Sequence, residues 1–175
     1  MYKLKEDGST QNSNIWAFNT RDLMRASTCE HCINLAVAKE LDMQGIYNLV
    51  GDRLCELFPD SQTLVIRTFE HEAGLEVWHY AKEKGERQHV EPRPLNWNSR
   101  QLILTQKSLD IKENYVEISR QHGGTGVTTG QPPKSAVFVP MLVGDVVKGS
   151  ISLQNVDKEH AFTDSDLRLL TTQVA

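Results

Sequence analysis

Residues 135–155, SAVFVPMLVGDVVKGSISLQN, decide the fold of this chain. Two strand-like runs, 135–143 and 146–154, flank Gly144-Asp145, a two-residue turn of the kind that closes β-hairpins. The first run is apolar on both faces, which is typical of a central strand with material packed above and below it. This stretch therefore predicts an antiparallel hairpin at the centre of a sheet.

A second hairpin is predicted upstream. Residues 63–70, TLVIRTFE, are rich in β-branched side chains, and residues 75–81, LEVWHYA, follow after a short turn that contains Gly74. Because successive side chains of a strand point to opposite faces, regular alternation puts Trp78 and Tyr80 on one face and Val77 on the other.

Helical patterns surround the two hairpins. Apolar spacing predicts N-terminal helices over 20–58, short helices over 100–106 and 112–121, and a C-terminal helix over 163–175. Asp42, Ser99 and Thr163 stand where N-cap residues are expected, and Asp166 completes a capping box with Thr163. Helices, then hairpins, then a helix indicate an α+β fold.

Three segments together resemble the C-terminal half of a GAF domain. They are PKSAVFVP at 133–140, VGDVVKGSISLQN at 143–155 and HAFTDSDLRLL at 160–170. ELDMQGIYNLVG at 40–51 is also similar to the first helix of bacterial GAF modules. The resemblance implies a GAF/PAS-like central sheet of five to six antiparallel strands. It places helices on one face, and a ligand pocket with short helices and loops on the other.

The resemblance also implies a setting. Residues 1–19 are expected to be a polar linker or tail, and 20–175 one GAF domain with its sheet and pocket at 62–155. Such domains pair through their terminal helices as homodimers and control an output domain of a bacterial multidomain sensor, such as a kinase or cyclase. The leucine-rich helix at 163–175 has no stop signal, which suggests that the natural protein continues.

Charge, hydropathy and cysteine content indicate which classes of partner and which cellular compartment to expect. The net charge is −4 and no cluster of Lys and Arg stands out, so we expect no nucleic-acid partner. No apolar run approaches the roughly 20 residues of a membrane-spanning helix, so we expect no membrane partner. An odd number of cysteines, three, favours a reducing compartment, and we expect a cytoplasmic protein.

Cys29-Glu30-His31-Cys32 leaves three interpretations open. Two thiols at this spacing lie on one side of a helix, where they can pack as small apolar groups, act as a redox sensor or contribute to a metal site. Packing is favoured because no second pair of metal ligands follows, and we predict no metal site. The chain has no cysteine after Cys55, which the resemblance makes unfavourable for covalent bilin attachment.

A ligand site is expected on the pocket face. Its candidate residues are aromatic side chains and one cation, which suit a small anionic or planar ligand: Trp78, Tyr80, Trp97, Arg100 and Tyr115. The glycine-rich segment 122–130 is expected to form a lid over the pocket. A purely structural role of these side chains, in a dimerisation module without ligand, stays open.

No hydrolytic motif stands out, so the sequence predicts no catalytic residues and a protein that is not an enzyme. It does not identify a cofactor. The predicted function is a sensory domain that binds a small molecule, dimerises, or does both. The alternatives are the structural dimerisation module and the cysteine-based redox sensor.

Overall fold

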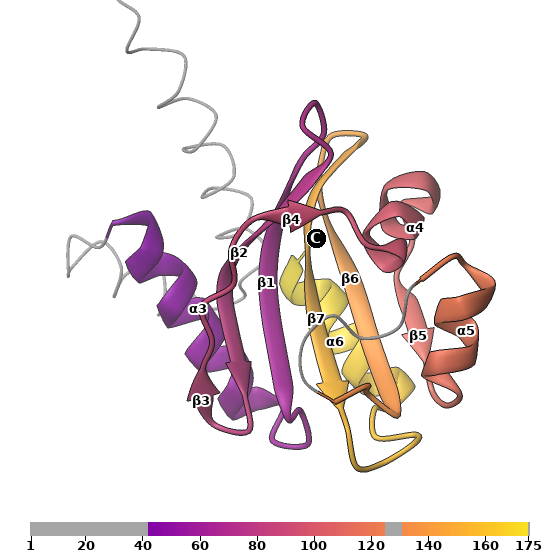
Figure 1. Cartoon of the computed structure of the whole chain (residues 1–175). Coiled ribbons are helices and arrows are strands. Elements are labelled where there is room, and N and C mark those ends of the chain that lie inside the picture. The colour runs from indigo at the N-terminus through magenta and orange to yellow at the C-terminus, as the bar shows by residue number, and fades with distance from the viewer. Residues whose placement is uncertain (1–41, 125–130, 175) are drawn as a thin grey trace, which may run out of the picture.

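The computed structural model describes residues 42–124 and 131–174. One antiparallel sheet runs through this part of the chain in the order β3-β2-β1-β7-β6-β5, with β4 paired to β2 (Figure 1). The long strands form the two predicted hairpins: β1 Thr63–Glu70, β2 Leu75–Glu83, β6 Ser135–Val143 and β7 Val146–Asn155. The short strands are β3 Glu86–Arg87, β4 Arg93–Pro94 and β5 Leu109–Ile111.

The two hairpins join at the centre of the sheet, where β1 pairs with β7 in an antiparallel register that sets Ile66 opposite Ile151. The turn of the second hairpin needs a left-handed backbone, and Gly144 supplies it with a φ of +59°. The apolar stretch quoted above therefore forms an antiparallel hairpin, β6 and β7, of which β7 lies at the centre of the sheet and β6 lies between β7 and the edge strand β5.

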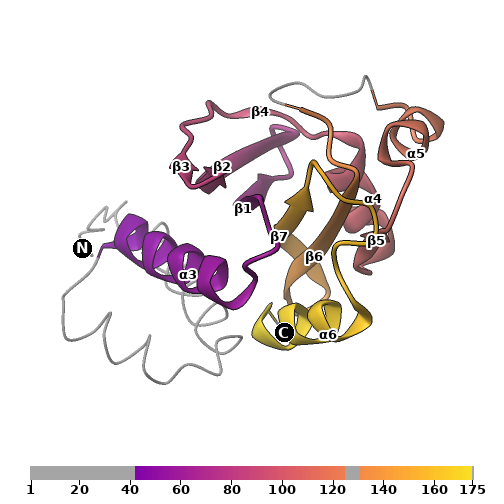
Figure 2. The same ribbon diagram turned by 90° about the horizontal axis from the view of Figure 1, so that it is seen from below.

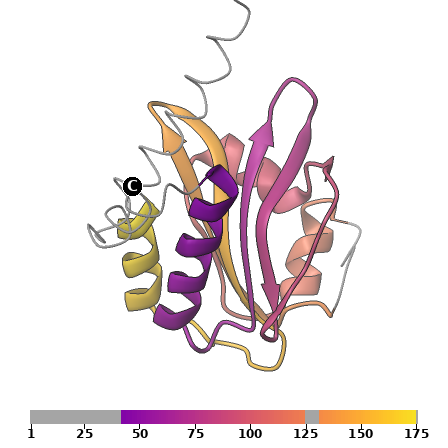
Figure 3. The same ribbon diagram turned by 90° about the vertical axis from the view of Figure 1, so that its left-hand side faces the viewer.

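Helices cover both faces of the sheet (Figure 2). α3, Met43–Leu57, and α6, Asp164–Val174, lie side by side on one face (Figure 3). α4, Trp97–Thr105, and α5, Tyr115–Gln121, lie on the other.

Each face of the sheet has its own apolar core. The larger core, under α3 and α6, includes Tyr47, Leu54, Ile66, Tyr80, Ile151 and Leu170. The smaller core, under α4 and α5, includes Phe69, Trp97, Leu102, Tyr115 and Phe138.

Two of the three predicted N-caps are confirmed. The side chain of Asp42 accepts a hydrogen bond from the backbone N–H of Gly45 at 2.7 Å. Thr163 and Asp166 form the reciprocal bonds of a capping box, 2.8 Å and 3.2 Å long. The third N-cap was wrong, because Asn96, not Ser99, accepts the bond that begins α4.

A β-bulge breaks the alternation of β2. Ile66 lies opposite Tyr80 and Arg67 lies opposite Trp78, so His79 is one extra residue in the ladder. Tyr80 joins the core under α3, whereas Trp78 donates a hydrogen bond to Glu76 on the α4 side of the sheet. The expectation that Trp78 and Tyr80 share a face is therefore wrong, because regular alternation holds only without a bulge.

The α+β fold is confirmed, with its antiparallel sheet, helices on one face and short helices on the other. The helix predicted over 112–121 begins three residues later than expected, at Tyr115, and the edge strand β5 at 109–111 precedes it. Within the described residues, no helix is both long and apolar enough to cross a membrane. Cys29, His31 and Cys32 lie outside the described residues, as does most of the segment predicted to be a lid.

Candidate functional site

Two opposite charges are buried between the sheet and α4. Arg67 comes from the middle of β1 and Glu76 from β2, and they are only 2% and 0% exposed. Both side chains lie on the α4 side of the sheet, where they contact residues of α4. A charged side chain is almost never fully buried unless it is paired, so the partners of these two residues define the site.

Glu76 is surrounded by hydrogen-bond donors. Its Oε1 accepts from Nε of Arg93 at 2.8 Å and from the indole N–H of Trp78 at 3.0 Å. Its Oε2 accepts from the hydroxyl of Ser99 at 2.6 Å. Arg67 Nη1 lies 3.4 Å from the same Oε2. One carboxylate therefore ties β1, β2, β4 and the first turn of α4 together.

Arg67 uses each of its nitrogens. Besides Nη1, which faces Glu76, its Nε donates to the hydroxyl of Ser150 on β7 at 2.9 Å. Its Nη2 donates to the side-chain oxygen of Asn98 on α4 at 2.8 Å. We call the five buried residues Arg67, Glu76, Asn98, Ser99 and Ser150 the polar cluster. The guanidinium also lies over the ring of Phe138, 5.7 Å from its centroid.

Burial and pairing shift the pKa values of both Arg67 and Glu76 in opposite directions. Burial raises the pKa of Glu76, but the charge of Arg67 and the bonds from Ser99, Trp78 and Arg93 outweigh it, and the net pKa is lowered. Burial lowers the pKa of Arg67, and Glu76 only partly restores it. Glu76 therefore stays ionised in the folded protein at neutral pH.

Tyr115 connects the polar cluster to a cavity. The hydroxyl of Tyr115 accepts a hydrogen bond from Nδ2 of Asn98 at 3.4 Å. Tyr115 also lines a cavity of about 530 Å³. Burial raises the pKa of Tyr115, so its hydroxyl keeps its proton at neutral pH.

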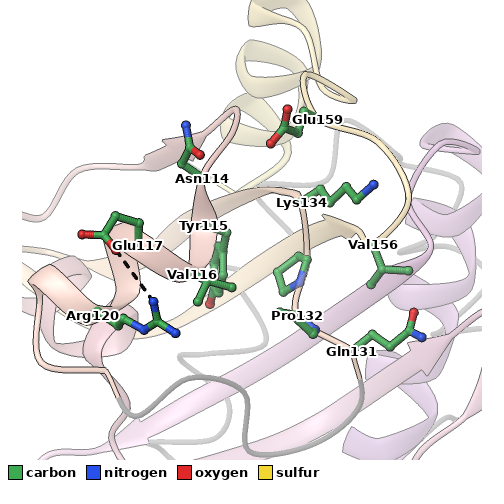
Figure 4. A pocket seen from close by; sticks show the side chains of 11 residues that line it. Asn114, Tyr115, Val116, Glu117, Arg120, Gln131, Pro132, Lys134, Val156 and Glu159 are labelled. Atoms are coloured by element: carbon green, nitrogen blue, oxygen red, sulfur yellow. Dashed lines mark ion pairs between the residues drawn. The ribbon is translucent and has the colours of Figure 1, made fainter.

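The cavity lies between α5 and the segments that enter β6 and leave β7. Figure 4 shows Asn114, Glu117 and Arg120 on one side, and Pro132, Lys134 and Val156 on the other. Both signs of charge are present, and Arg120 lies 3.9 Å from Glu117. A volume within the usual range of about 300–1,000 Å³ for ligand pockets, with apolar and charged walls, suits a small molecule.

The five predicted site residues are not brought together. Tyr115 lines the cavity, and the other four do not. Trp97 is buried behind Tyr115, with ring centroids 5.9 Å apart, and Trp78 borders the polar cluster through Glu76. Arg100 is exposed on α4, where its Nε donates to the backbone oxygen of Leu95 at 3.0 Å.

Tyr80 lies on the opposite face of the sheet, next to α3. Its hydroxyl donates to the carboxylate of Asp52 at 2.7 Å and lies 3.4 Å from Sγ of Cys55. Burial raises the pKa of Tyr80, and the bonds to Cys55 and Asp52 raise it further. Cys55 is a free thiol, and it is separated from the polar cluster by the sheet.

The polar cluster was missed in the sequence, although a signal was present. Arg67 interrupts an apolar β-branched run, and Glu76 is the second residue of the alternating strand that follows. A charge at an inward position of a predicted strand indicates a buried pair. The identity of its partners could not be derived, since they come from β4, α4 and β7. Among the described residues, no group of three or more His, Cys, Asp or Glu side chains is placed to hold a metal ion.

No protein-family model matches the chain, and no curated protein matches it. Solved structures do. The GAF domain of a phosphoenolpyruvate-protein phosphotransferase from Acinetobacter is 12% identical, with 95% of this chain and 90% of that chain covered and a TM-score of 0.61. The fold is that of a GAF domain.

Two further solved structures share this fold. A free methionine-R-sulfoxide reductase from Neisseria meningitidis, solved in complex with its substrate, is 15% identical, with 99% of this chain and 92% of that chain covered and a TM-score of 0.61. A far-red absorbing dark-state structure with bound biliverdin is 13% identical, with 87% and 93% covered and a TM-score of 0.57.

These similarities correct one prediction. The chain was expected not to be an enzyme, because its sequence shows no hydrolytic motif. The Neisseria reductase is an enzyme, and it shares the fold of the described part of this chain. The expectation is therefore wrong, because this fold carries catalysis as well as ligand binding.

Proposed function

We propose that this chain is a sensory domain that binds a small molecule in the cavity beside α5 and thereby regulates an output domain of a longer signalling protein. The observation that carries the proposal is the cavity of about 530 Å³ lined by Tyr115, whose hydroxyl also contacts the polar cluster. A ligand in the cavity would contact the same tyrosine that Asn98 holds in place.

The polar cluster supplies a route for the signal. Asn98 receives its bond from Arg67, which in turn contacts β2 through Glu76 and β7 through Ser150. A shift of Tyr115 would disturb bonds to several elements at once, because buried hydrogen-bonded networks rearrange as a unit. A ligand that prefers one arrangement shifts the population towards it.

The proposal extends to the rest of the protein. We infer that residues 20–175 form one domain after a linker at 1–19, in a cytoplasmic bacterial protein. The terminal helices would pair with those of a second copy. Leu57 on α3 and Leu169 on α6 are 40% and 41% exposed, and exposed leucines on neighbouring helices suit such a contact.

Native mass spectrometry of the freshly purified chain tests the ligand. We expect an added mass that is released when the same sample is denatured. Val116→Trp places a large side chain in the cavity lining, and it should abolish the added mass. Val146→Trp is the matched control, because Val146 is 43% exposed in the β6–β7 hairpin and does not line the cavity.

Two outcomes contradict the proposal. One is a wild-type chain without added mass that also shows no rise in Tm with amino acids, nucleotides or tetrapyrroles, since a bound ligand at a hundredfold excess over Kd stabilises by about 2.7 kcal/mol. A dimer with that behaviour would favour a structural dimerisation module. The other is an added mass that survives Val116→Trp, which would place the ligand elsewhere.

A further inference from the structure

Arg93 is bound to its own protein in the way that a ligand is bound. Its Nε donates to Oε1 of Glu76 at 2.8 Å, and its guanidinium carbon lies 4.2 Å from the centroid of the Trp78 ring. A carboxylate acceptor together with an aromatic face is the combination that recognises planar cations. The Arg93 side chain is 21% exposed, whereas that of Glu76 is fully buried beneath it.

The receiving groups are held in place without Arg93. The indole N–H of Trp78 donates to the same Oε1 at 3.0 Å, which fixes the ring relative to the carboxylate. Nδ2 of Asn96 approaches that oxygen to 3.3 Å. Because these bonds are independent of Arg93, the aromatic face and the acceptor are preorganised, and preorganisation lowers the cost of binding.

Arg93 is also the partner of Glu76 that can leave. Arg67 stays 3.4 Å from Glu76, so the buried carboxylate keeps one positive partner when Arg93 departs. The backbone of β4 is held by pairing of Arg93 with Glu76 and of Pro94 with Leu75. Departure of the side chain breaks its bond to Glu76, its contact with the Trp78 ring and the further contacts that it makes, and it moves the side chain towards the solvent that it already touches.

We propose that Trp78 and Glu76 form a binding site for a guanidinium compound, and that Arg93 occupies this site as an internal ligand. An external guanidinium binds when it replaces the Arg93 side chain over Trp78 and donates to Glu76. This site is separate from the cavity beside α5, because neither Trp78 nor Glu76 lines that cavity. Either proposal can therefore fail without the other.

An internal ligand lowers the affinity for an external one in proportion to its occupancy. If Arg93 fills the site in nine-tenths of the molecules, the apparent affinity falls about tenfold. Arg93→Ala removes the competitor and leaves the receiving groups. The variant should bind methylguanidinium at least ten times more tightly than the wild-type chain does.

The chain offers a matched control on the opposite face of β2. Arg87 lies over the ring of Tyr80, 3.7 Å from its centroid, and among the described residues the buried carboxylate is that of Glu76, which binds Arg67 and Arg93. The carboxylate that the Tyr80 hydroxyl contacts is that of Asp52, whose side chain is 60% exposed. Arg87→Ala therefore removes a cation from an aromatic face without opening a comparable site, and it should leave the binding of methylguanidinium at the wild-type level.

The experiment is a calorimetric titration of the full chain and its variants with methylguanidinium chloride and, separately, with tetramethylammonium chloride. We expect one saturable site in Arg93→Ala that moves the indole N–H resonance of Trp78. Tetramethylammonium has no N–H to donate to Glu76, so it should bind at least ten times more weakly. Arg93→Gln keeps most of the side-chain length without the charge, and it provides the same test if the alanine variant does not fold.

Three results would overturn the proposal. They are the absence of saturable binding in both Arg93 variants, binding in Arg87→Ala that equals binding in the Arg93 variants, and equal affinity for the two cations. The first result would show that the site does not exist, and the second that binding does not depend on the buried carboxylate. The third would show that the site does not distinguish a guanidinium from another cation.

Discussion

The substitution Glu76→Gln should destabilise the protein more than any change at a surface charge. It keeps the shape of the side chain but removes the only anion that faces the buried Arg67 guanidinium in the polar cluster. Breaking a buried pair by removing one partner costs about 3–5 kcal/mol, because the remaining charge is left without compensation in a poorly solvated place. That range is a large fraction of the 5–15 kcal/mol that stabilises a typical domain.

Urea unfolding at pH 7 measures the effect as a change in the free energy of unfolding. Glu117→Gln is the control, because Glu117 lies 3.9 Å from Arg120 and both side chains are more than 60% exposed. Exposed pairs of this kind contribute about 0–1 kcal/mol. A loss below about 1 kcal/mol for Glu76→Gln, or one equal to the control, would refute the argument that burial makes this pair costly to break.

The same reasoning predicts that the stability of the wild-type chain and that of Glu76→Gln depend differently on pH in acid. The folded pKa of Glu76 lies below its value in the unfolded chain, about 4.5, so the unfolded state binds its proton first as the pH falls. The stability that Glu76 contributes is fully present above that value and is lost as the pH falls through the folded pKa. Below about pH 4.5 the wild-type chain should lose stability more steeply than Glu76→Gln does.

Two further substitutions test the packing of the sheet. Tyr47→Phe should raise the free energy of unfolding by about 1 kcal/mol at pH 8, because Tyr47 is 2% exposed and its hydroxyl has no hydrogen-bond partner in the described part of the chain. A variant that is less stable than the wild-type chain in urea at pH 8 would contradict this expectation. Burial raises the pKa of Tyr47 to about 12, so the wild-type chain should also lose stability as the pH rises from 10 to 12, and the variant should lose less. Gly149→Ala should cost about 1–3 kcal/mol in the same assay, because its Cβ would lie 2.2 Å from the backbone oxygen of Arg67 and 2.5 Å from Cε of Met141. Val146→Ala, in the same hairpin, is its control, and equal losses would show that the close approach is relieved at no cost.

Local pattern was enough for most of the fold. The two long hairpins, the N-cap at Asp42 and the capping box at Thr163 were predicted because each depends on residues within a few positions of one another. The edge strand β5 was missed because its three residues, Leu109–Ile111, are too short to show a period. A strand of that length exists only because β6 offers it a partner.

The candidate site was predicted much less well. Of the residues proposed for the ligand site, Tyr115 lines the cavity, whereas Arg100 is exposed on α4 and Tyr80 lies on the other face of the sheet. Tyr80 lies on the other face because of the β-bulge at His79. A single extra residue in a strand cannot be recognised from the sequence pattern. The lid expected over 122–130 falls mostly outside the described residues.

By itself, the sequence determined the α+β class, the antiparallel hairpins and their flanking helices, because alternation and capping are read over short distances. Only the tertiary structure decided that Arg67 and Glu76 are buried together, that Arg93 lies over Trp78, and that Tyr115 joins this cluster to a cavity. The physical reason is that a buried charge needs several partners at once. Here β2, β4, β7 and α4 supply them, and they meet only when the sheet has formed.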